Sequence, residues 1–334
     1  MLSHMRSLFK WFIAGLIVGG NLLAAANDCD RACLKGALDQ YMNAVVKHDP
    51  ASAPLFVGFR QTENAVVVRP GTGMWKTVTA LGKVQRRYLD PVSGQAAYFG
   101  TVEEGANSAI VTVRVKVENR RVAEAEWFIA RNGDPGLNGP AAPGQPAGNF
   151  FEPDNLAANP PPDKPMAKEA WSSREAMIAA TNSYFDGITT HDGSIIMAHP
   201  GCARLENGNT VTGRSGGGRG KAAAPATGGP PAVTDCTSGL QNINVELVAG
   251  RRYPVVDEEA GLVLALAVFV RKPGTPTRRN AFSEWFVIEN NKIRSIYSAM
   301  FYPPPDAPVP NWPPYEGNWP LPAELAPQTP TLYR

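Results

Sequence analysis

Six side chains in this sequence have types and surroundings that suit proton-transfer chemistry. Glu126 and Glu284 lie in two similar segments, residues 125–129 and 283–287, which share the order Glu-Trp-Phe. A carboxyl group among aromatic and aliphatic neighbours has a raised pKa, so either glutamate could act as a general acid or base near neutral pH. The other candidates are Glu63, Tyr88, Tyr253 and His199.

Each glutamate also has a structural interpretation. Because side chains alternate along a strand, Glu126 points away from the core if Trp127 points into it. The same parity applies to Glu284 beside Trp285, and both glutamates would then be solvated or interface carboxylates. Glu63 precedes an asparagine at a predicted hairpin bend, where the asparagine serves the turn and the glutamate contacts a nearby arginine.

The tyrosines and the histidine are candidates for assisting such a carboxylate. Tyr88 and Tyr253 each follow two arginines and could donate a hydrogen bond to an oxyanion, although a core tyrosine with a satisfied hydroxyl is the commoner arrangement. His199 follows the second predicted helix, and the first half of the chain has no histidine near the matching place. This asymmetry suits a functional residue, but loops also diverge freely.

The pattern of the remaining residues argues against several other classes of chemistry. The few histidines lack a credible Ser or Cys partner for a nucleophilic triad. The glycine-rich run 213–220 neither follows a buried strand nor opens a helix, as a phosphate-binding loop does. The net charge is +2, with dispersed arginines and lysines. We therefore predict no cofactor, no metal and no nucleic-acid partner.

The chain contains an internal duplication, which sets the architecture that must position these residues. Five residues recur at a constant separation of 143 positions. The pairs are Tyr41 and Tyr184, His48 and His191, Asp49 and Asp192, Glu63 and Glu206, and Asn64 and Asn207. An Arg-Arg-Tyr segment recurs later at 165 positions, and a glycine-rich insertion in the second copy explains most of the difference. The two Glu-Trp-Phe segments indicate the same duplication.

Hydrophobic spacing predicts the elements of each copy. One helix is predicted from Asp30 to His48, and a second begins at Ser172, whose spacing to Glu175 is that of a capping box. Three strands follow in each copy, at 95–103, 108–118 and 122–131 and at 262–271, 281–289 and 292–302. A helix, a small hairpin and a run of antiparallel strands predict an α+β unit in which a curved sheet wraps around helices.

Proline and glycine concentrate in three stretches, which divides the chain into parts. The predicted parts are a signal peptide (1–26), the first repeat (27–133), a linker (134–170), the second repeat (171–302) with an insertion (213–231), and a proline-rich tail (303–334).

The first 26 residues have the features of a secretory signal peptide. A positive start with Arg6 and Lys10 is followed by the apolar run 11–23 and by three alanines. An uncleaved anchor is the alternative, but the apolar run is shorter than the roughly 20 residues that a membrane span needs. We expect a periplasmic or secreted protein with no stable membrane insertion after cleavage.

The four cysteines fit an oxidising compartment. We predict that Cys29 pairs with Cys33 and Cys202 with Cys236, because each pair lies within one repeat. The second bridge would close a loop that contains the insertion. A redox or zinc site is the alternative, but the spacing of the first pair is C-x3-C and no histidine pair lies nearby at ligand spacing.

The order of elements, the size of each unit and the N-terminal segment resemble a tandem of nuclear-transport-factor-2-like domains. This cone-shaped fold is shared by ketosteroid isomerase, scytalone dehydratase and the SnoaL-type polyketide cyclases. The region Cys29 to Arg131 is similar to an uncharacterised family of exported bacterial and fungal proteins of that fold. The segments that carry this closer resemblance are 33–34, 62–64, 73–75, 99–102 and 114–118. The resemblance implies a pocket between helices and sheet in each of two SnoaL-like domains.

We therefore expect an exported, cofactor-independent lyase or isomerase that uses dehydratase-like acid–base chemistry on a small organic molecule. The alternative is a non-catalytic protein that binds a small molecule or a carbohydrate, for which Trp312 and Trp319 of the tail offer stacking surfaces. A carboxyl group in a closed pocket with a raised pKa would favour the enzyme. Single-domain relatives dimerise through the outer face of the sheet, so we also expect the two repeats to pair within a monomer.

Overall fold

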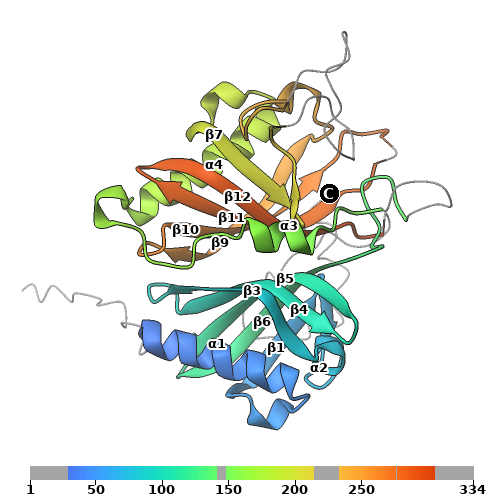
Figure 1. The fold of residues 1–334 in the computed structure, drawn as a ribbon, viewed down its shortest axis with the longest axis vertical. Coiled ribbons are helices and arrows are strands. Elements are labelled where there is room, and N and C mark those ends of the chain that lie inside the picture. Colours follow the sequence, from blue (N-terminus) through green and yellow to red (C-terminus); the bar gives the residue numbers. More distant parts are fainter. Residues whose placement is uncertain (1–28, 141–147, 214–232, 276, 305–334) are drawn as a thin grey trace, which may run out of the picture.

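The computed structural model describes residues 29–140, 148–213, 233–275 and 277–304, which form two similar halves (Figure 1). Each half is an α+β unit with one long helix and a six-stranded sheet. The predicted α+β class with two sheet domains is confirmed. The predicted signal peptide, most of the insertion and most of the tail lie outside the described residues.

The two repeats present their elements in the same order. The first contains α1 (Arg31–Val46), β1 (Leu55–Glu63), β2 (Val66–Val68), α2 (Met74–Thr77), β3 (Ala80–Asp90), β4 (Gln95–Glu104), β5 (Asn107–Glu118) and β6 (Arg121–Arg131). The second contains α4 (Arg174–Thr190), β7 (Ala198–Glu206), β8 (Asn209–Thr210), β9 (Leu247–Asp257), β10 (Leu262–Val270), β11 (Asn280–Glu289) and β12 (Lys292–Phe301). The helix α3 (Pro153–Ala158) lies between the repeats in the sequence, within the predicted linker.

Both sheets have the same topology. The strand orders are β2-β1-β6-β5-β4-β3 and β8-β7-β12-β11-β10-β9. The sheets are mixed rather than antiparallel as predicted, because the first and last long strands of each repeat run parallel. The last three strands of each repeat confirm the prediction. The hydrophobic spacing of the sequence does not predict the strands β3 and β9. Their pairing with the neighbouring strands β4 and β10 is interrupted by shifts of register.

The long helices begin and end as their sequences indicate, with one difference. The side chain of Asp30 accepts a hydrogen bond from the backbone amide of Cys33 and caps α1. In α4 the capping residue is Ser173 rather than the predicted Ser172, whose hydroxyl instead accepts from the backbone amide of Asn291. His48 and His191 follow the two helices with positive φ, a backbone conformation that ends a helix.

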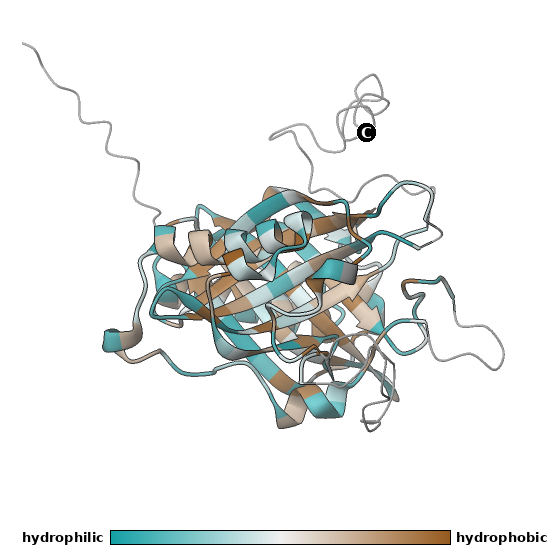
Figure 2. Cartoon of the chain, turned by 90° about the horizontal axis from the view of Figure 1, so that it is seen from above, coloured by the Kyte–Doolittle hydropathy of each residue, from teal (hydrophilic) through white to brown (hydrophobic). Residues whose placement is uncertain are grey.

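Each sheet packs one face on the helix of its own repeat. In the first repeat this core contains Tyr41, Trp75 and Trp127, and in the second it contains Phe185 and Phe286. Figure 2 shows hydrophobic residues along the strands and hydrophilic ones in many of the connecting loops. The strands therefore bury one apolar face in the core of each repeat.

The opposite faces of the two sheets pack against each other. Figure 1 shows the layers in the order α1, first sheet, second sheet, α4. A third buried cluster joins the sheets, and it includes Phe99, Phe128, Leu264, Trp285 and Phe301. Both faces of each sheet are therefore covered, and the two repeats share a buried apolar layer between their sheets.

Polar contacts across this layer are reciprocal. Arg31, at the start of α1, donates two hydrogen bonds of 2.8 and 3.0 Å to Asp257 at the end of β9. The same carboxylate accepts from the backbone amide of Leu89. Arg174, at the start of α4, donates bonds of 2.9 and 2.8 Å to Asp90 at the end of β3. The interface thus repeats the same contact in both directions.

The two Glu-Trp-Phe segments are not equivalent in the structure, which corrects the sequence prediction. Residues 125–129 belong to β6, the last strand of the first repeat, whereas residues 283–287 belong to β11, the penultimate strand of the second. Trp127 lies in the core of its own repeat, but Trp285 lies between the sheets. Glu284 therefore points into its repeat while Glu126 points out of its own.

Two disulfides join the predicted cysteines. Cys29 is bonded to Cys33, and Cys202 to Cys236. The first lies at the start of α1 and the second ties β7 to the segment after the insertion. The pairing predicted from the sequence is confirmed.

Candidate functional site

A cluster of polar side chains lies inside the second repeat. Glu284 on β11 pairs across the strands with Ser298 on β12, which in turn pairs with Glu206 on β7. Paired residues point to the same face of a sheet, so these three side chains are neighbours. Arg204, two residues before Glu206, shares this face, and Tyr184 comes from α4. We call these five residues the polar cluster.

Arg204 contacts two members of the polar cluster. Its Nη1 atom donates a hydrogen bond of 2.5 Å to the hydroxyl of Tyr184, and its Nε atom lies 3.3 Å from a carboxylate oxygen of Glu206. Glu284 is 2% exposed, and its Oε2 atom has no hydrogen-bond partner among the described residues. The hydroxyl of Ser298 also lacks a partner in that part of the chain. A buried carboxyl group is therefore held with unused hydrogen-bonding capacity.

The surroundings of Glu284 keep it protonated. Burial raises the pKa of Glu284 to about 8, although Arg204 acts in the opposite direction, and the negative charge of Glu206 adds to the rise. Burial also raises the pKa of Tyr184. At neutral pH the cluster thus contains a neutral carboxylic acid close to a second glutamate that faces a guanidinium.

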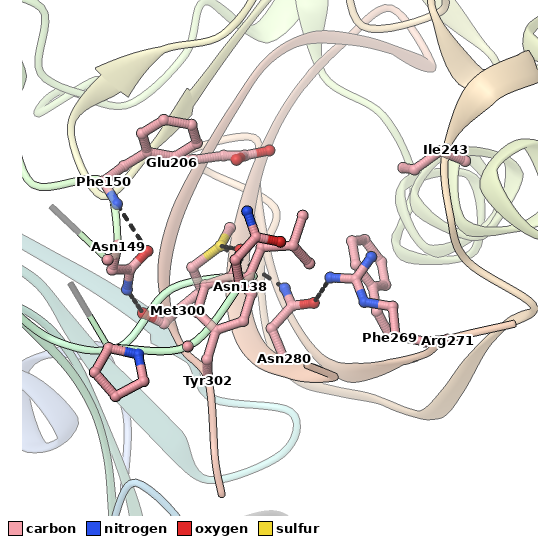
Figure 3. A pocket seen from close by; sticks show the side chains of 14 residues that line it. Asn138, Asn149, Phe150, Glu206, Ile243, Phe269, Arg271, Asn280, Met300 and Tyr302 are labelled. Atoms are coloured by element: carbon pink, nitrogen blue, oxygen red, sulfur yellow. Dashed lines mark hydrogen bonds between the residues drawn. The ribbon is translucent and has the colours of Figure 1, made fainter. Parts of the chain in front are cut away.

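A pocket of about 600 Å³ opens beside the polar cluster (Figure 3). Glu206 is the member of the cluster that lies in its wall, and Met300 and Asn280 continue the same faces of β12 and β11. Apolar side chains make up much of the lining, while loop residues from the predicted linker complete it. The lining residues are Leu137, Asn138, Gly139, Pro140, Gly148, Asn149, Phe150, Glu206, Ile243, Phe269, Arg271, Asn280, Met300 and Tyr302. This size and composition suit a small organic ligand.

The corresponding interior of the first repeat is filled. Glu63 pairs with Trp127 on β6 as Glu206 pairs with Ser298 on β12, so a tryptophan replaces the serine. Trp127 in turn pairs with Val113, which replaces Glu284. The indole of Trp127 donates a 2.9 Å hydrogen bond to Tyr41. The charged cluster of the second repeat is thus replaced by packed aromatic and aliphatic groups.

Glu63 also has a different environment from its counterpart Glu206. Its carboxylate accepts hydrogen bonds from the backbone amide of Met74, at the start of α2, and from the side chain of Gln61. Burial raises the pKa of Glu63, while these two donors lower it. The structure places Glu63 against α2, whose place in the second repeat is taken by a 3-10 turn at Leu240–Asn242.

Glu126 lies at the interface between the repeats. It is 5% exposed, and Arg252 of the second repeat donates two hydrogen bonds to its carboxylate, at 2.7 and 3.1 Å. Arg114 donates another at 3.0 Å. Burial alone would raise the pKa of Glu126, but Arg252 and Arg114 hold it below its ordinary value. Glu126 is therefore an ionised carboxylate in an inter-repeat network, remote in role from the general acid that the sequence predicts.

The remaining candidates lie apart from the pocket wall. The hydroxyl of Tyr88 donates to the backbone oxygen of Pro162, and burial raises its pKa. The hydroxyl of Tyr253 donates to Asn182, and burial raises its pKa to about 12. His199 contacts the backbone oxygen of Glu289 through Nε2, at 2.8 Å. The structure brings none of the three to the lining of the pocket of the second repeat.

Sequence reasoning passed over several residues of this site. Arg204 and Arg271 were not candidates, and Glu206 was recognised only as the repeat counterpart of Glu63. One usable signal was the fixed separation of 143 positions, which sets Arg204 against Gln61. Gln61 is neutral whereas Arg204 is charged, so this pair marks a position where the interiors of the two repeats differ.

Comparison with known proteins adds one match. Residues 170–300 match a family described as a domain of unknown function (DUF8021). The matched region spans the second repeat, which contains the polar cluster. No curated protein matches the chain. Within the described residues, no helix is long and apolar enough to cross a membrane, and no group of three His, Cys, Asp or Glu residues could hold a metal ion.

Proposed function

We propose that the second repeat is the functional half of an exported, cofactor-independent lyase or isomerase. Its ligand is a small organic molecule held in the pocket, and Glu206 is the acid–base residue that touches it. The observation that carries this proposal is the cross-strand row of a buried, protonated Glu284, Ser298 and Glu206, in which Glu206 lies beside Arg204 at the wall of a largely apolar pocket.

Two carboxyl groups in different environments can take different roles in an acid–base site. The carboxylate of Glu206 takes a proton from a carbon next to a carbonyl group of the ligand. The proton then returns to another carbon, which completes an isomerisation, or to a departing hydroxyl group, which leaves as water. Glu284 does not touch the ligand; it is a positioning residue that sets the charge around Arg204 and Glu206.

The arrangement of each repeat supports the proposal that the chain is a tandem of nuclear-transport-factor-2-like (SnoaL-like) domains. A long helix covers one face of a six-stranded sheet, and the pocket opens on that face in the second repeat. Export is supported by the two disulfides, which are typical of oxidising compartments.

A non-catalytic binding protein is the second candidate. The observation that favours it is the position of Glu284, which is 2% exposed and absent from the pocket wall. In this case the polar cluster would shape the pocket without transferring protons, and the ligand would leave unchanged.

Proton exchange with solvent distinguishes the two candidates without knowledge of the natural substrate. The full chain is incubated in deuterated water with a panel of small ketones, 2-oxo acids and 3-hydroxy acids, and deuterium incorporation is followed by NMR. We expect exchange into at least one compound, and a decrease of about 100-fold or more for E206Q, as for the loss of a general base.

The first repeat offers a matched control. E63Q changes the equivalent glutamate outside the pocket and should leave exchange unchanged, while E284Q should shift its pH profile. Binding of panel compounds without any exchange would overturn the enzyme in favour of a binding protein. Equal loss of exchange in E63Q and E206Q would contradict the assignment to the second repeat.

A further inference from the structure

We propose that the pocket of the second repeat recognises a carboxylate group on its ligand, and that Arg271 is the residue that binds it. This inference rests on the proposed function, because it assumes that a small molecule occupies the pocket. It names the chemical class of that molecule: a small monocarboxylic acid with an apolar body.

Arg271 has hydrogen-bonding capacity that the protein leaves unused. A guanidinium group has five N–H donors. Three are occupied, by the backbone oxygens of Arg278 and Asn244 and by the side-chain oxygen of Asn280. The other two, one on each terminal nitrogen, have no acceptor among the described residues, and no carboxylate there lies within ion-pairing distance. A cation in a pocket wall is thus left without an anion.

The first repeat shows what a paired arginine looks like at the same end of the sheet. There Arg131, the last residue of β6, donates to both carboxylate oxygens of Glu104, the last residue of β4. When β10 is aligned with β4 from their first residues, Arg271 occupies the position of Glu104. Tyr302, the residue after β12, occupies the position of Arg131 at the end of β6. The second repeat therefore has a cation where the first has a carboxylate, and a tyrosine where the first has the arginine that pairs with it.

The environment of Arg271 favours an anionic partner. Its guanidinium lies 5.7 Å from the ring centre of Phe269, and both residues line the pocket together with Met300 (Figure 3). Burial lowers the pKa of Arg271, while Tyr302 and Glu206 act in the opposite direction. A carboxylate accepted here would form charge-assisted hydrogen bonds in a partly desolvated site, where such bonds are strong.

The opposite wall limits the ligand to one negative charge. Glu206 lines the same pocket, and a second carboxylate close to it would be repelled. A hydroxyl or other donor fits there instead, while Phe269 and Met300 contact the body of the ligand. These groups together select a hydroxylated monocarboxylic acid over a dicarboxylic acid or a neutral compound.

Matched pairs of compounds test the inference. Binding of 4-hydroxybenzoate and 4-hydroxybenzamide, and of 3-phenyllactate and its amide, is measured on the full chain by titration calorimetry and ligand-observed NMR. The amides keep the shape but remove the charge. We expect each acid to bind at least tenfold more tightly than its amide, and R271Q to reduce this preference to within twofold.

The control is R294Q, which removes a half-exposed arginine on β12 that pairs with Glu289 and should leave the preference unchanged. R271K, which keeps the charge, should keep part of the preference if R271Q loses stability. Equal affinity for acid and amide in the unmodified chain would overturn the inference while leaving the proposed function standing. Failure of every compound to bind would count against the pocket itself and therefore against both.

Discussion

Asp90 and Asp257 each end an edge strand and each bind the arginine that begins the long helix of the other repeat. Arg174 reaches Asp90 and Arg31 reaches Asp257, and the side chains of both aspartates are 1% exposed. Such reciprocity is the property of an isologous interface, in which one surface patch meets its own copy. The two repeats therefore pair within one chain as the subunits of a symmetric dimer would.

Breaking either of these contacts should destabilise the protein. D90N or D257N leaves a partly buried arginine and a backbone amide with a weaker acceptor, and we expect each to cost about 2–4 kcal/mol. Denaturant unfolding measures the loss. E289Q, which removes the partly exposed partner of the half-exposed Arg294, should cost well under about 1 kcal/mol. Equal effects of the interface and surface variants would contradict this role.

The internal pairing also predicts the oligomeric state. Because the outer face of each sheet is buried against the other repeat, neither face is free to join a second chain. We expect light scattering coupled to size-exclusion chromatography to give the mass of one chain, independent of protein concentration in the micromolar range. A mass that doubles with concentration would contradict the prediction.

The raised pKa of Glu284 predicts an unusual pH dependence of stability. In the unfolded chain the pKa of Glu284 is near its ordinary value of 4.5, whereas in the folded protein it is about 8. Between these two pH values the unfolded chain loses the proton while the folded protein keeps it, so the free energy of unfolding falls as the pH rises. Above about pH 8 both states are ionised and the loss is complete. Glutamine removes this penalty, and E284Q should be more stable than the natural protein by on the order of 3 kcal/mol at pH 7.

Unfolding free energies measured from pH 4 to 9 check this sign. Below pH 4.5 the two proteins should be similar, and the difference should grow with pH and level off above about pH 8. E126Q is the matched control, because the pKa of Glu126 is lowered rather than raised. E126Q should have a lower unfolding free energy than the natural protein at pH 7, and a similar one at low pH. A constant difference across the range for E284Q would contradict the raised pKa.

The two disulfides should differ in their contributions. Cys202 and Cys236 are 34 positions apart, whereas Cys29 and Cys33 are 4 apart. In the chain-entropy model, the longer loop contributes roughly 4 kcal/mol and the shorter about 2 kcal/mol. We therefore expect C202S/C236S to lower the unfolding free energy more than C29S/C33S. The reverse order would show that local effects on α1 outweigh loop closure.

Much of the architecture follows from local sequence. Side-chain size and short-range hydrogen bonding dictate the helix after Asp30, the turns at His48 and His191, and the turns in which asparagines have positive φ. Because such features recur in both halves of the chain, they reveal two copies of one unit. The cysteine pairs could be assigned because each lies within one copy. These features depend on residues close together in the sequence.

The candidate site could be predicted only in part. Glu284 was identified as a carboxyl group among apolar residues, and its pKa is raised. The reasoning that paired it with Glu126 failed, because strands β6 and β11 differ in position and therefore in the face that each glutamate presents. Similar segments cannot reveal which strand of a sheet they occupy, since the same alternation fits any strand with one apolar face.

The sequence by itself determined the duplication, the α+β class and the type of side chain available for proton transfer. Only the tertiary structure decided which of those side chains share an interior. Strand pairing brings Glu206 of β7 beside Ser298 and Glu284 of the consecutive strands β12 and β11, which lie far from β7 in the sequence, and it sets Trp127 in the matching place of the other repeat. The physical reason is that register and the burial of a sheet's two faces are fixed by long-range packing, which no local pattern encodes.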